Sequence, residues 1–294
     1  MTTMTRMLGR AVAAGVRGVA QCHQHHQQLA YTRFATATRA LQTSTQCHNL
    51  SKTTTSESIK RFYEKASVVP CDGGFQVHLD KRSLKTPKRN TFVVPSEELA
   101  HTVAFEWDVQ GDVIEPSSMN VTLLCNTAID NPSGMSHEDR IDNVEPFMRT
   151  DTVCFREDTS RALIDMQSEI WDPIVEWFAM RYNQPLMVTY RLDEVQSPEA
   201  VAIMRRELLG MTPFELTAYE LAADTAKSAV IALALREGAI NAQEATAAAR
   251  LETDFQTSRF GEVEWAHTIE KHDTQARLAA SAIVMRLARE ATLA

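Results

Sequence analysis

The chain has 294 residues, of which 30 are Lys or Arg and 38 are Asp or Glu, so its formal net charge is −8. Residues 1–56 contain six basic and no acidic side chains, which leaves the remainder with a net charge of −14. An acidic protein is a poor nucleic-acid binder, because phosphates must be neutralised by clustered Lys and Arg. No apolar run approaches the roughly 18 residues of a membrane-spanning helix, so no membrane insertion is predicted.

The first segment has the pattern of a mitochondrial presequence. On a helix, Arg6, Arg10 and Arg17 would lie on one side, with apolar residues opposite them. An Arg-rich, acid-free amphipathic start is typical of transit peptides, whereas a secretory signal needs an unbroken apolar core. We therefore expect residues 1–45 to be a cleaved presequence and residues 46–58 a flexible spacer, with the mature protein in the mitochondrial matrix. The alternative is a disordered basic tail that binds nucleic acid or membrane.

Residues 59–132 are predicted to form a β-rich N-terminal domain. Phe75, Val77 and Leu79 alternate with polar residues, as in a strand that is buried on one face. Turns are predicted at residues 72–74 and 80–82, and a further strand at residues 91–94. A helix should begin after Ser96, which suits an N-cap, and run to about Val109. Residues 112–132 are expected to be irregular or extended.

Residues 133–294 are predicted to form an α-helical domain. Helix starts are indicated by capping residues at Ser136, Ser160, Ser197, Thr212 and Asn241. The second of these helices should break or kink near Pro173, with Asp172 as the next cap. The alanine-rich helix from Pro213 should run to Glu237 and pack in the core. Gly261 should separate the last two helices. The predicted fold class is α+β, with a small β-rich domain followed by a larger all-α domain.

Catalytic motifs are scarce. No nucleotide-binding motif, nucleophile elbow or H-E-x-x-H zinc motif is present. The Cys22–His26 cluster lies in the predicted presequence, and the remaining cysteines include no C-x-x-C pair. Two E-x-x-H pairs, Glu98/His101 and Glu264/His267, have the spacing used in di-iron bundles, so a metal-dependent oxidoreductase is an alternative. Two unrelated surface or packing pairs are the simpler interpretation. We expect no catalytic residue, no metal site and no cofactor.

Several runs that combine polar and aromatic residues have no evident catalytic role. They are Leu84–Pro87, Glu106–Asp108, Met119–Asp130, Asp151–Arg156, Trp171–Trp177 and Gly261–His267. Taken together and in this order, over roughly residues 60–290, they make the chain resemble the mitochondrial ATP synthase F(1) complex assembly factor family, the chaperones of the alpha subunit.

This resemblance implies a non-catalytic protein. Members of the family bind the unassembled alpha subunit of the ATP synthase head and keep it from aggregating until it pairs with the beta subunit. The resemblance also implies the same order of a β-rich and an α-helical domain. Nothing in the sequence calls for more than a monomer. A matrix protein that binds some other partner is the remaining alternative.

Four residues are candidates for partner binding. Trp107 is one, because Trp is enriched at binding hot spots, although it could instead close the core between strands and helix. The resemblance implies an important acidic residue in the C-terminal helices, and Glu252 and Glu264 match it. Trp265 stands beside Glu264 in the last of the polar-aromatic runs. Glu264 could equally stabilise the start of the last helix.

Overall fold

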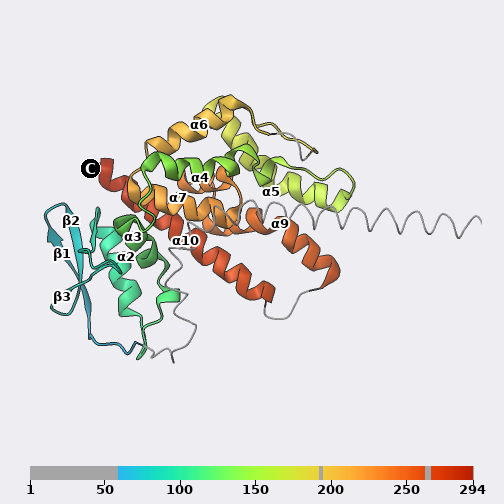
Figure 1. Cartoon of the computed structure of the whole chain (residues 1–294). Coiled ribbons are helices and arrows are strands. Elements are labelled where there is room, and N and C mark those ends of the chain that lie inside the picture. The colour runs from blue at the N-terminus through green and yellow to red at the C-terminus, as the bar shows by residue number, and fades with distance from the viewer. Residues whose placement is uncertain (1–58, 192–194, 262–265, 294) are drawn as a thin grey trace, which may run out of the picture. The chain divides into compact units, whose positions relative to one another are not determined.

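An antiparallel sheet opens the described part of the chain, which comprises residues 59–191, 195–261 and 266–293 of the computed structural model (Figure 1). The sheet consists of β1 (Ala66–Cys71), β2 (Gly74–Leu79), β3 (Arg82–Ser83) and β4 (Val93–Val94). The central strand β2 pairs with each of the other three strands. The predicted presequence (1–45) and spacer (46–58) lie outside the described residues.

The alternation predicted for β2 is confirmed. Val77 and Leu79 are buried, and Phe75 packs against the same core. Gly74 is required where β2 begins, because its φ is +144° and a Cβ there would lie 2.3 Å from the carbonyl oxygen of Val94. Helix α2 (Glu97–Asp108) covers this face with four buried residues and starts at Ser96, whose hydroxyl accepts from the backbone N–H of Leu99.

The prediction for residues 112–132 is wrong, because they contain a 3-10 turn, η2 (Pro116–Ser118), and helix α3 (Asn120–Asp130). No side chain next to the start of α3 caps it. The Glu106 carboxylate from α2 does so instead, accepting from the backbone N–H groups of Val121 at 2.8 Å and Thr122 at 2.7 Å. A cap supplied from another helix leaves no local signal in the sequence.

Helices make up the rest of the described chain. They are α4 (His137–Arg149), α5 (Arg161–Tyr182), α6 (Pro198–Leu209), α7 (Pro213–Ala226), α8 (Ala229–Arg236), α9 (Ala242–Phe260) and α10 (Ala266–Leu293), with a 3-10 turn η3 (Thr152–Cys154) between α4 and α5. Ser136, Ser197, Thr212 and Asn241 cap their helices as predicted. The α+β class, with a small sheet followed by a larger helical part, is therefore confirmed.

Helix α5 is continuous through Pro173, so the break predicted near that residue does not occur. Asp172 is not a cap, because its carboxylate accepts from Nη1 of Arg156 at 2.7 Å. Arg156 follows η3, so the carboxylate that looked like a local helix start is used by a distant part of the chain.

The stretch from Pro213 to Glu237 is two helices rather than one. Lys227, in the left-handed region with φ 54°, ends α7, and Ser228 caps α8 by accepting from the N–H of Ile231. The buried carboxylate of Asp151 holds this break. It accepts from the Ser228 hydroxyl at 2.6 Å and from the N–H of Val230 at 2.9 Å. The expectation that this stretch lies in the core is right for both helices.

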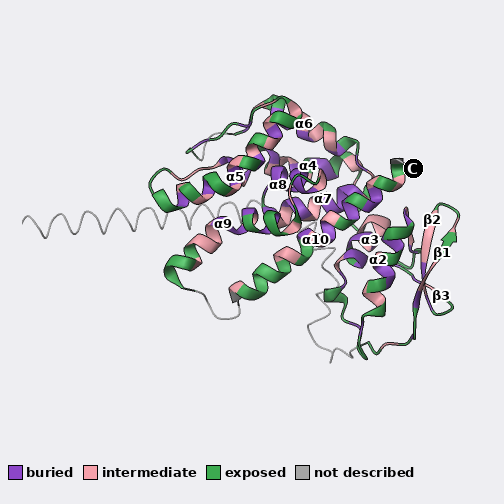
Figure 2. Ribbon diagram, turned by 180° about the vertical axis from the view of Figure 1, so that it is seen from behind, coloured by how far each residue is buried: buried purple, intermediate pink, exposed green. Residues whose placement is uncertain are grey.

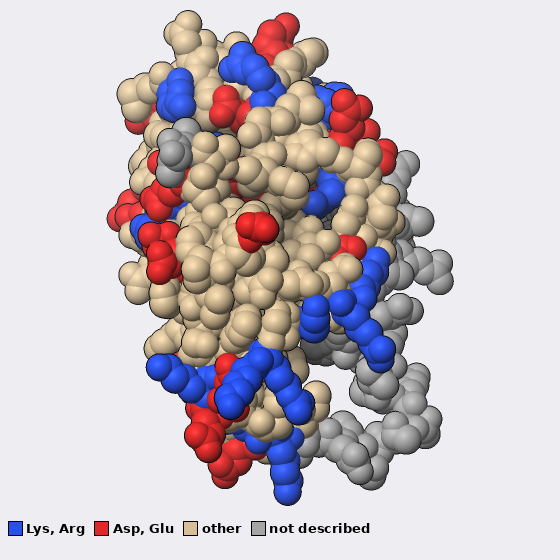
Figure 3. Space-filling model, turned by 90° about the vertical axis from the view of Figure 1, so that its left-hand side faces the viewer, with Lys and Arg blue, Asp and Glu red and all other residues tan. Residues whose placement is uncertain are grey.

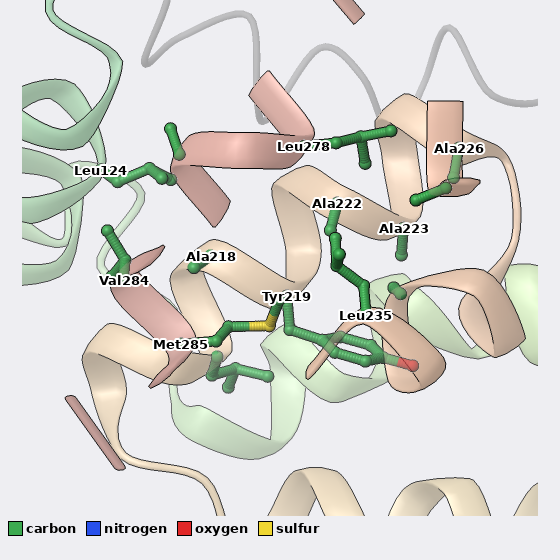
Figure 4. Close-up of a cluster of buried hydrophobic side chains, with 14 of the residues drawn as sticks. Leu124, Ala218, Tyr219, Ala222, Ala223, Ala226, Leu235, Leu278, Val284 and Met285 are labelled. Carbon is green, nitrogen blue, oxygen red and sulfur yellow. The ribbon is translucent and has the colours of Figure 1, made fainter. Parts of the chain in front are cut away.

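Helix α7 lies at the centre of the helical core. Figure 4 shows its small residues, among them Ala218 and Ala222, surrounded by Leu124 of α3, Leu235 of α8 and Met285 of α10. Small side chains let neighbouring helices approach closely. Helix α10 also contacts α3 and α2, so it connects the core of the helices with the helix that covers the sheet. None of the described helices has the length and apolar character that a membrane crossing requires.

Candidate functional site

The predicted metal pairs do not come together in the described chain. Glu98 and His101 are exposed on α2, where the His101 ring lies 3.7 Å from the Glu97 carboxylate. His267 lies 3.9 Å from Glu270 on α10, and Glu264 is outside the described residues. Among the residues that the structure describes, no group of three or more His, Cys, Asp or Glu side chains is placed to hold a metal ion.

An open hollow on the described surface lies at the end of α2 and has a volume of about 580 Å³. Its apolar lining comes from Phe105, Val109 and Val113, and its acidic lining from Glu106, Asp112 and Glu115. Phe105 is 67% exposed and Val109 is 59% exposed. Exposed apolar side chains that line a hollow together are a feature of interaction sites, so these residues form a candidate binding surface. We call this hollow the α2 cleft.

The N-terminal segment of the described chain fixes one side of the α2 cleft. Lys60 pairs with Val113 in an antiparallel bridge, which is held by the N–H of Ile114 donating to the carbonyl of Ile59 at 2.8 Å. Ile59 and Phe62 in this segment are both more than half exposed. The segment therefore adds two further apolar side chains to the surface near the α2 cleft.

Arg61 makes this arrangement rigid. Its guanidinium donates to the carbonyl oxygens of Asp108 and Gln110, where α2 ends, and to those of Tyr63 and Glu64. The last carbonyls of a helix have no partner inside the helix, so a cation that donates to them stabilises the end. The backbone around the α2 cleft is consequently held in place before any partner binds.

Glu106 lines the α2 cleft and also caps the start of α3. Its two carboxylate oxygens accept from Val121 N–H, Thr122 N–H and the Thr122 hydroxyl, the last at 2.6 Å. Burial raises the pKa of Glu106, while the hydrogen bonds from Thr122 and Val121 lower it. This carboxylate lines the α2 cleft but is already occupied, so Asp112 and Glu115 are the acidic groups that a partner can meet.

Replacing Glu106 with alanine should lower the free energy of unfolding by about 2 kcal/mol, because the start of α3 loses its cap and three donors lose their acceptor. Urea denaturation measures this change. The control is Glu169→Ala, which removes an exposed glutamate on α5 and should change stability by less than about 0.5 kcal/mol. Equal effects of the two substitutions would contradict the capping role.

Trp107 lies behind the α2 cleft rather than in its lining. The indole is partly buried, packs edge-on against Tyr63 with ring centroids 5.7 Å apart, and belongs to the shell around the core. Its carbonyl accepts from the Tyr63 hydroxyl at 2.7 Å. Its buried indole N–H has no acceptor among the described residues. Trp107 thus supports the surface from inside, and a direct role in partner binding stays a prediction.

The other predicted binding residues belong to the α9–α10 region. The Glu252 carboxylate on α9 accepts from the side-chain amide of Gln167 on α5 at 3.3 Å. Phe260 at the end of α9 is 86% exposed, and Ile269 early in α10 is 64% exposed. Figure 2 shows that these two helix ends are largely exposed. Glu264 and Trp265 lie between them, outside the described residues, so no structure can be assigned to that part of the prediction.

Charge is distributed unevenly over the described surface. Figure 3 faces the side with the sheet, and Lys and Arg gather over its lower part. Residues 59–95 contain eight Lys or Arg and three Asp or Glu, whereas residues 96–294 contain 16 and 34. The strong negative charge of the protein therefore belongs to the part of the chain that starts with α2 and includes the acidic lining of the α2 cleft.

Known proteins resemble this chain in both sequence and fold. The family model described as ATP12 chaperone protein matches residues 60–179. The crystal structure of Atp12 from Paracoccus denitrificans superposes with a TM-score of 0.72 at 31% identity, covering 79% of this chain and 99% of that chain. The chain belongs to the ATP12 chaperone family. The family recognised from the polar-aromatic runs is thereby confirmed.

Two eukaryotic members of the ATP12 family extend the comparison. Mitochondrial atp12 of Schizosaccharomyces pombe is 28% identical over 241 residues, covering 78% of this chain and 83% of the relative. Mitochondrial ATP12 of Saccharomyces cerevisiae is 24% identical over 286 residues, covering 82% and 86%. Both relatives are named as mitochondrial, which supports a mitochondrial location for this chain.

The apolar residues of the α2 cleft were missed in the sequence. Phe105 and Val109 are four residues apart on one side of α2, while Leu99, Val103 and Ala104 form its buried side. The spacing alone cannot say which of two apolar stripes faces the core. A second apolar stripe on a helix that already has one is the signal that could have identified this surface.

Proposed function

We propose that this ATP12-family chain is an assembly chaperone of the mitochondrial ATP synthase head, and that its client is the unassembled alpha subunit in the matrix. The observation that carries the proposal is the match to Atp12 of Paracoccus denitrificans, which covers nearly all of that chain. The client itself is inferred from the family resemblance of the polar-aromatic runs.

The described surface suits such a task. A subunit that awaits its neighbours exposes an apolar interface, since large obligate interfaces resemble a protein core cut in half. Covering it reversibly requires exposed apolar side chains on a rigid support, and the α2 cleft provides both through Phe105, Val109 and the fixed Arg61. We therefore propose a non-catalytic monomer that needs no cofactor and releases its client by exchange for the correct partner subunit.

The residues predicted to bind the client enter this proposal with different roles. Trp107 would support the α2 cleft, whereas Glu252, Glu264 and Trp265 would provide a second contact at the α9–α10 end.

Capture of purified subunits tests the proposal. The tagged chain, mixed with free alpha subunit, should retain it and suppress the light scattering that its aggregation produces. The assembled ATP synthase head should not be retained, because the surface that the chaperone covers is then occupied by beta subunits. Failure to retain free alpha subunit at low salt, or equal retention of the assembled head, would contradict the proposal.

A further inference from the structure

We infer that the α2 cleft binds a client segment that presents one bulky apolar side chain with a basic residue beside it. This inference rests on the proposed function and specifies the chemistry of the segment that is recognised. The occupant is thus part of the client protein, and its side chains must complement the apolar lining residues of the α2 cleft and its two exposed carboxylates, Asp112 and Glu115, which we call the rim.

The apolar half of the inference follows from exposure and volume. Phe105, Val109 and Val113 are each at least 36% exposed and line one hollow of about 580 Å³. This volume is within the range of about 300–1,000 Å³ that is typical of binding pockets. A Phe, Leu or Trp side chain placed there would remove apolar surface from water on both partners, which is the main source of affinity at such sites.

The basic half follows from the charges at the rim. Asp112 and Glu115 are exposed, and neither carboxylate lies within 4.0 Å of a Lys, Arg or His nitrogen among the described residues. Asp108, which is close in sequence, is used differently, since its carboxylate accepts from Ala66 N–H at 2.7 Å and lies 3.8 Å from Arg61. The lining therefore has two carboxylates available to a partner and no Lys or Arg.

Two cations near the α2 cleft, Arg61 and Lys60, could reduce the attraction between its carboxylates and a basic residue of the client. The Arg61 guanidinium donates to four backbone carbonyls and is turned into the fold. Lys60 is exposed and stands opposite Val113 in the bridge. Lys60 must oppose an incoming basic residue, so its neutralisation should strengthen binding of a basic segment rather than weaken it.

Short fluorescent peptides provide the probe, used with the full chain. One peptide carries Phe flanked by two Arg in a Gly-Ser background, the second has Ala in place of Phe, and the third has Glu in place of both Arg. The Phe–Arg peptide should bind best. The Ala peptide should bind about tenfold more weakly, because burial of the Phe ring is lost. The Glu peptide should bind about fivefold more weakly at low salt, and this difference should shrink at high salt.

Variants of the rim assign the effect to the α2 cleft. Asp112→Asn combined with Glu115→Gln should abolish the preference for Arg over Glu while the preference for Phe over Ala remains. Lys60→Gln should increase that preference for Arg by about twofold or more. Equal binding of the Phe and Ala peptides, an unchanged charge preference in the rim variant, or no binding of any peptide overturns the inference.

Capture of free alpha subunit, measured in parallel, distinguishes a failure of this inference from a failure of the proposed function. If the wild-type chain captures the subunit but shows none of these peptide preferences, the inference fails and the proposed function stands. If the wild-type chain does not capture the subunit, the proposed function fails irrespective of the peptide results.

Discussion

Replacing Asp151 with alanine should lower the free energy of unfolding by about 3 kcal/mol at pH 7, one of the two largest effects that we expect. The Asp151 side chain is fully buried and accepts hydrogen bonds from Val153 N–H, the Ser228 hydroxyl and Val230 N–H. It thereby holds η3 against the start of α8. Alanine leaves three buried donors without an acceptor, and the loss exceeds the gain from removing a buried charge.

The cost of this substitution should depend on pH. Burial raises the pKa of Asp151 to about 6, although the hydrogen bonds from Ser228, Val230 and Val153 lower it. The ordinary value is 3.8, so the folded state binds the proton more tightly than the unfolded state between these two pH values. Wild-type stability from this group is greatest below pH 3.8 and declines as pH rises to about 6. The Asp151→Ala cost should therefore be about 1 kcal/mol larger at pH 5 than at pH 7.

Chemical denaturation at the two pH values measures both effects. The matched control is Asp158→Ala, which removes an exposed aspartate from the loop after η3 and should change stability by less than about 0.5 kcal/mol at either pH. A cost for Asp151→Ala that is the same at both pH values, or larger at pH 7, would show that its carboxylate does not titrate as its burial implies.

The second large effect concerns client capture. Phe105→Asp combined with Val109→Asp should weaken retention of free alpha subunit at least about tenfold, because both substitutions place a carboxylate in the apolar part of the α2 cleft. Both residues are more than half exposed, so the fold should tolerate the change. Capture at a series of chaperone concentrations, together with the circular dichroism of each protein, measures the two properties separately.

Met180→Asp is the matched control for this pair. Met180 is 79% exposed on α5, so the substitution introduces one carboxylate, against two in the pair, at an apolar surface position elsewhere in the molecule. Capture should remain close to that of the wild type. If Met180→Asp weakens capture as strongly as the pair on α2, the effect is a general response to added negative charge, and the α2 cleft is not the client site.

The elements that could be predicted are those whose start is determined by neighbouring residues. Ser136, Thr212 and Asn241 each cap a helix together with an acidic residue three positions later, and both members of such a box are visible in the sequence. The alternation along β2 is equally local. These predictions succeeded because the interacting groups lie within four residues of each other.

The elements that were missed depend on carboxylates from distant positions. Glu106 starts α3 from the preceding helix, and Asp151 divides α7 from α8 across 77 residues of sequence. Asp172 led to the opposite error. It was predicted to cap a new helix, but its carboxylate pairs with Arg156 instead. In all three cases a charged side chain that could act locally is used by another element, which the spacing of residues cannot show.

The candidate site was predictable only in part. The Glu106–Asp108 run lies at the end of α2, next to the α2 cleft, but Trp107 was the residue selected from it, and the exposed Phe105 lies outside that run. Trp107 was predicted to bind a partner because of its residue type, whereas in the fold its ring packs against Tyr63. Exposure is a property of the packed helix, and it becomes visible only when the buried stripe of α2 has been identified.

Helix α10 has a consequence for the order of events in the cell. It is the last helix in the chain, yet its Leu278, Val284 and Met285 complete the core around α7 and it also contacts α2 and α3. A chain that is synthesised N-terminus first cannot close this core until helix α10 has been made. Until then α7 lacks its main neighbour, so the incomplete chain would itself expose an apolar surface in need of protection.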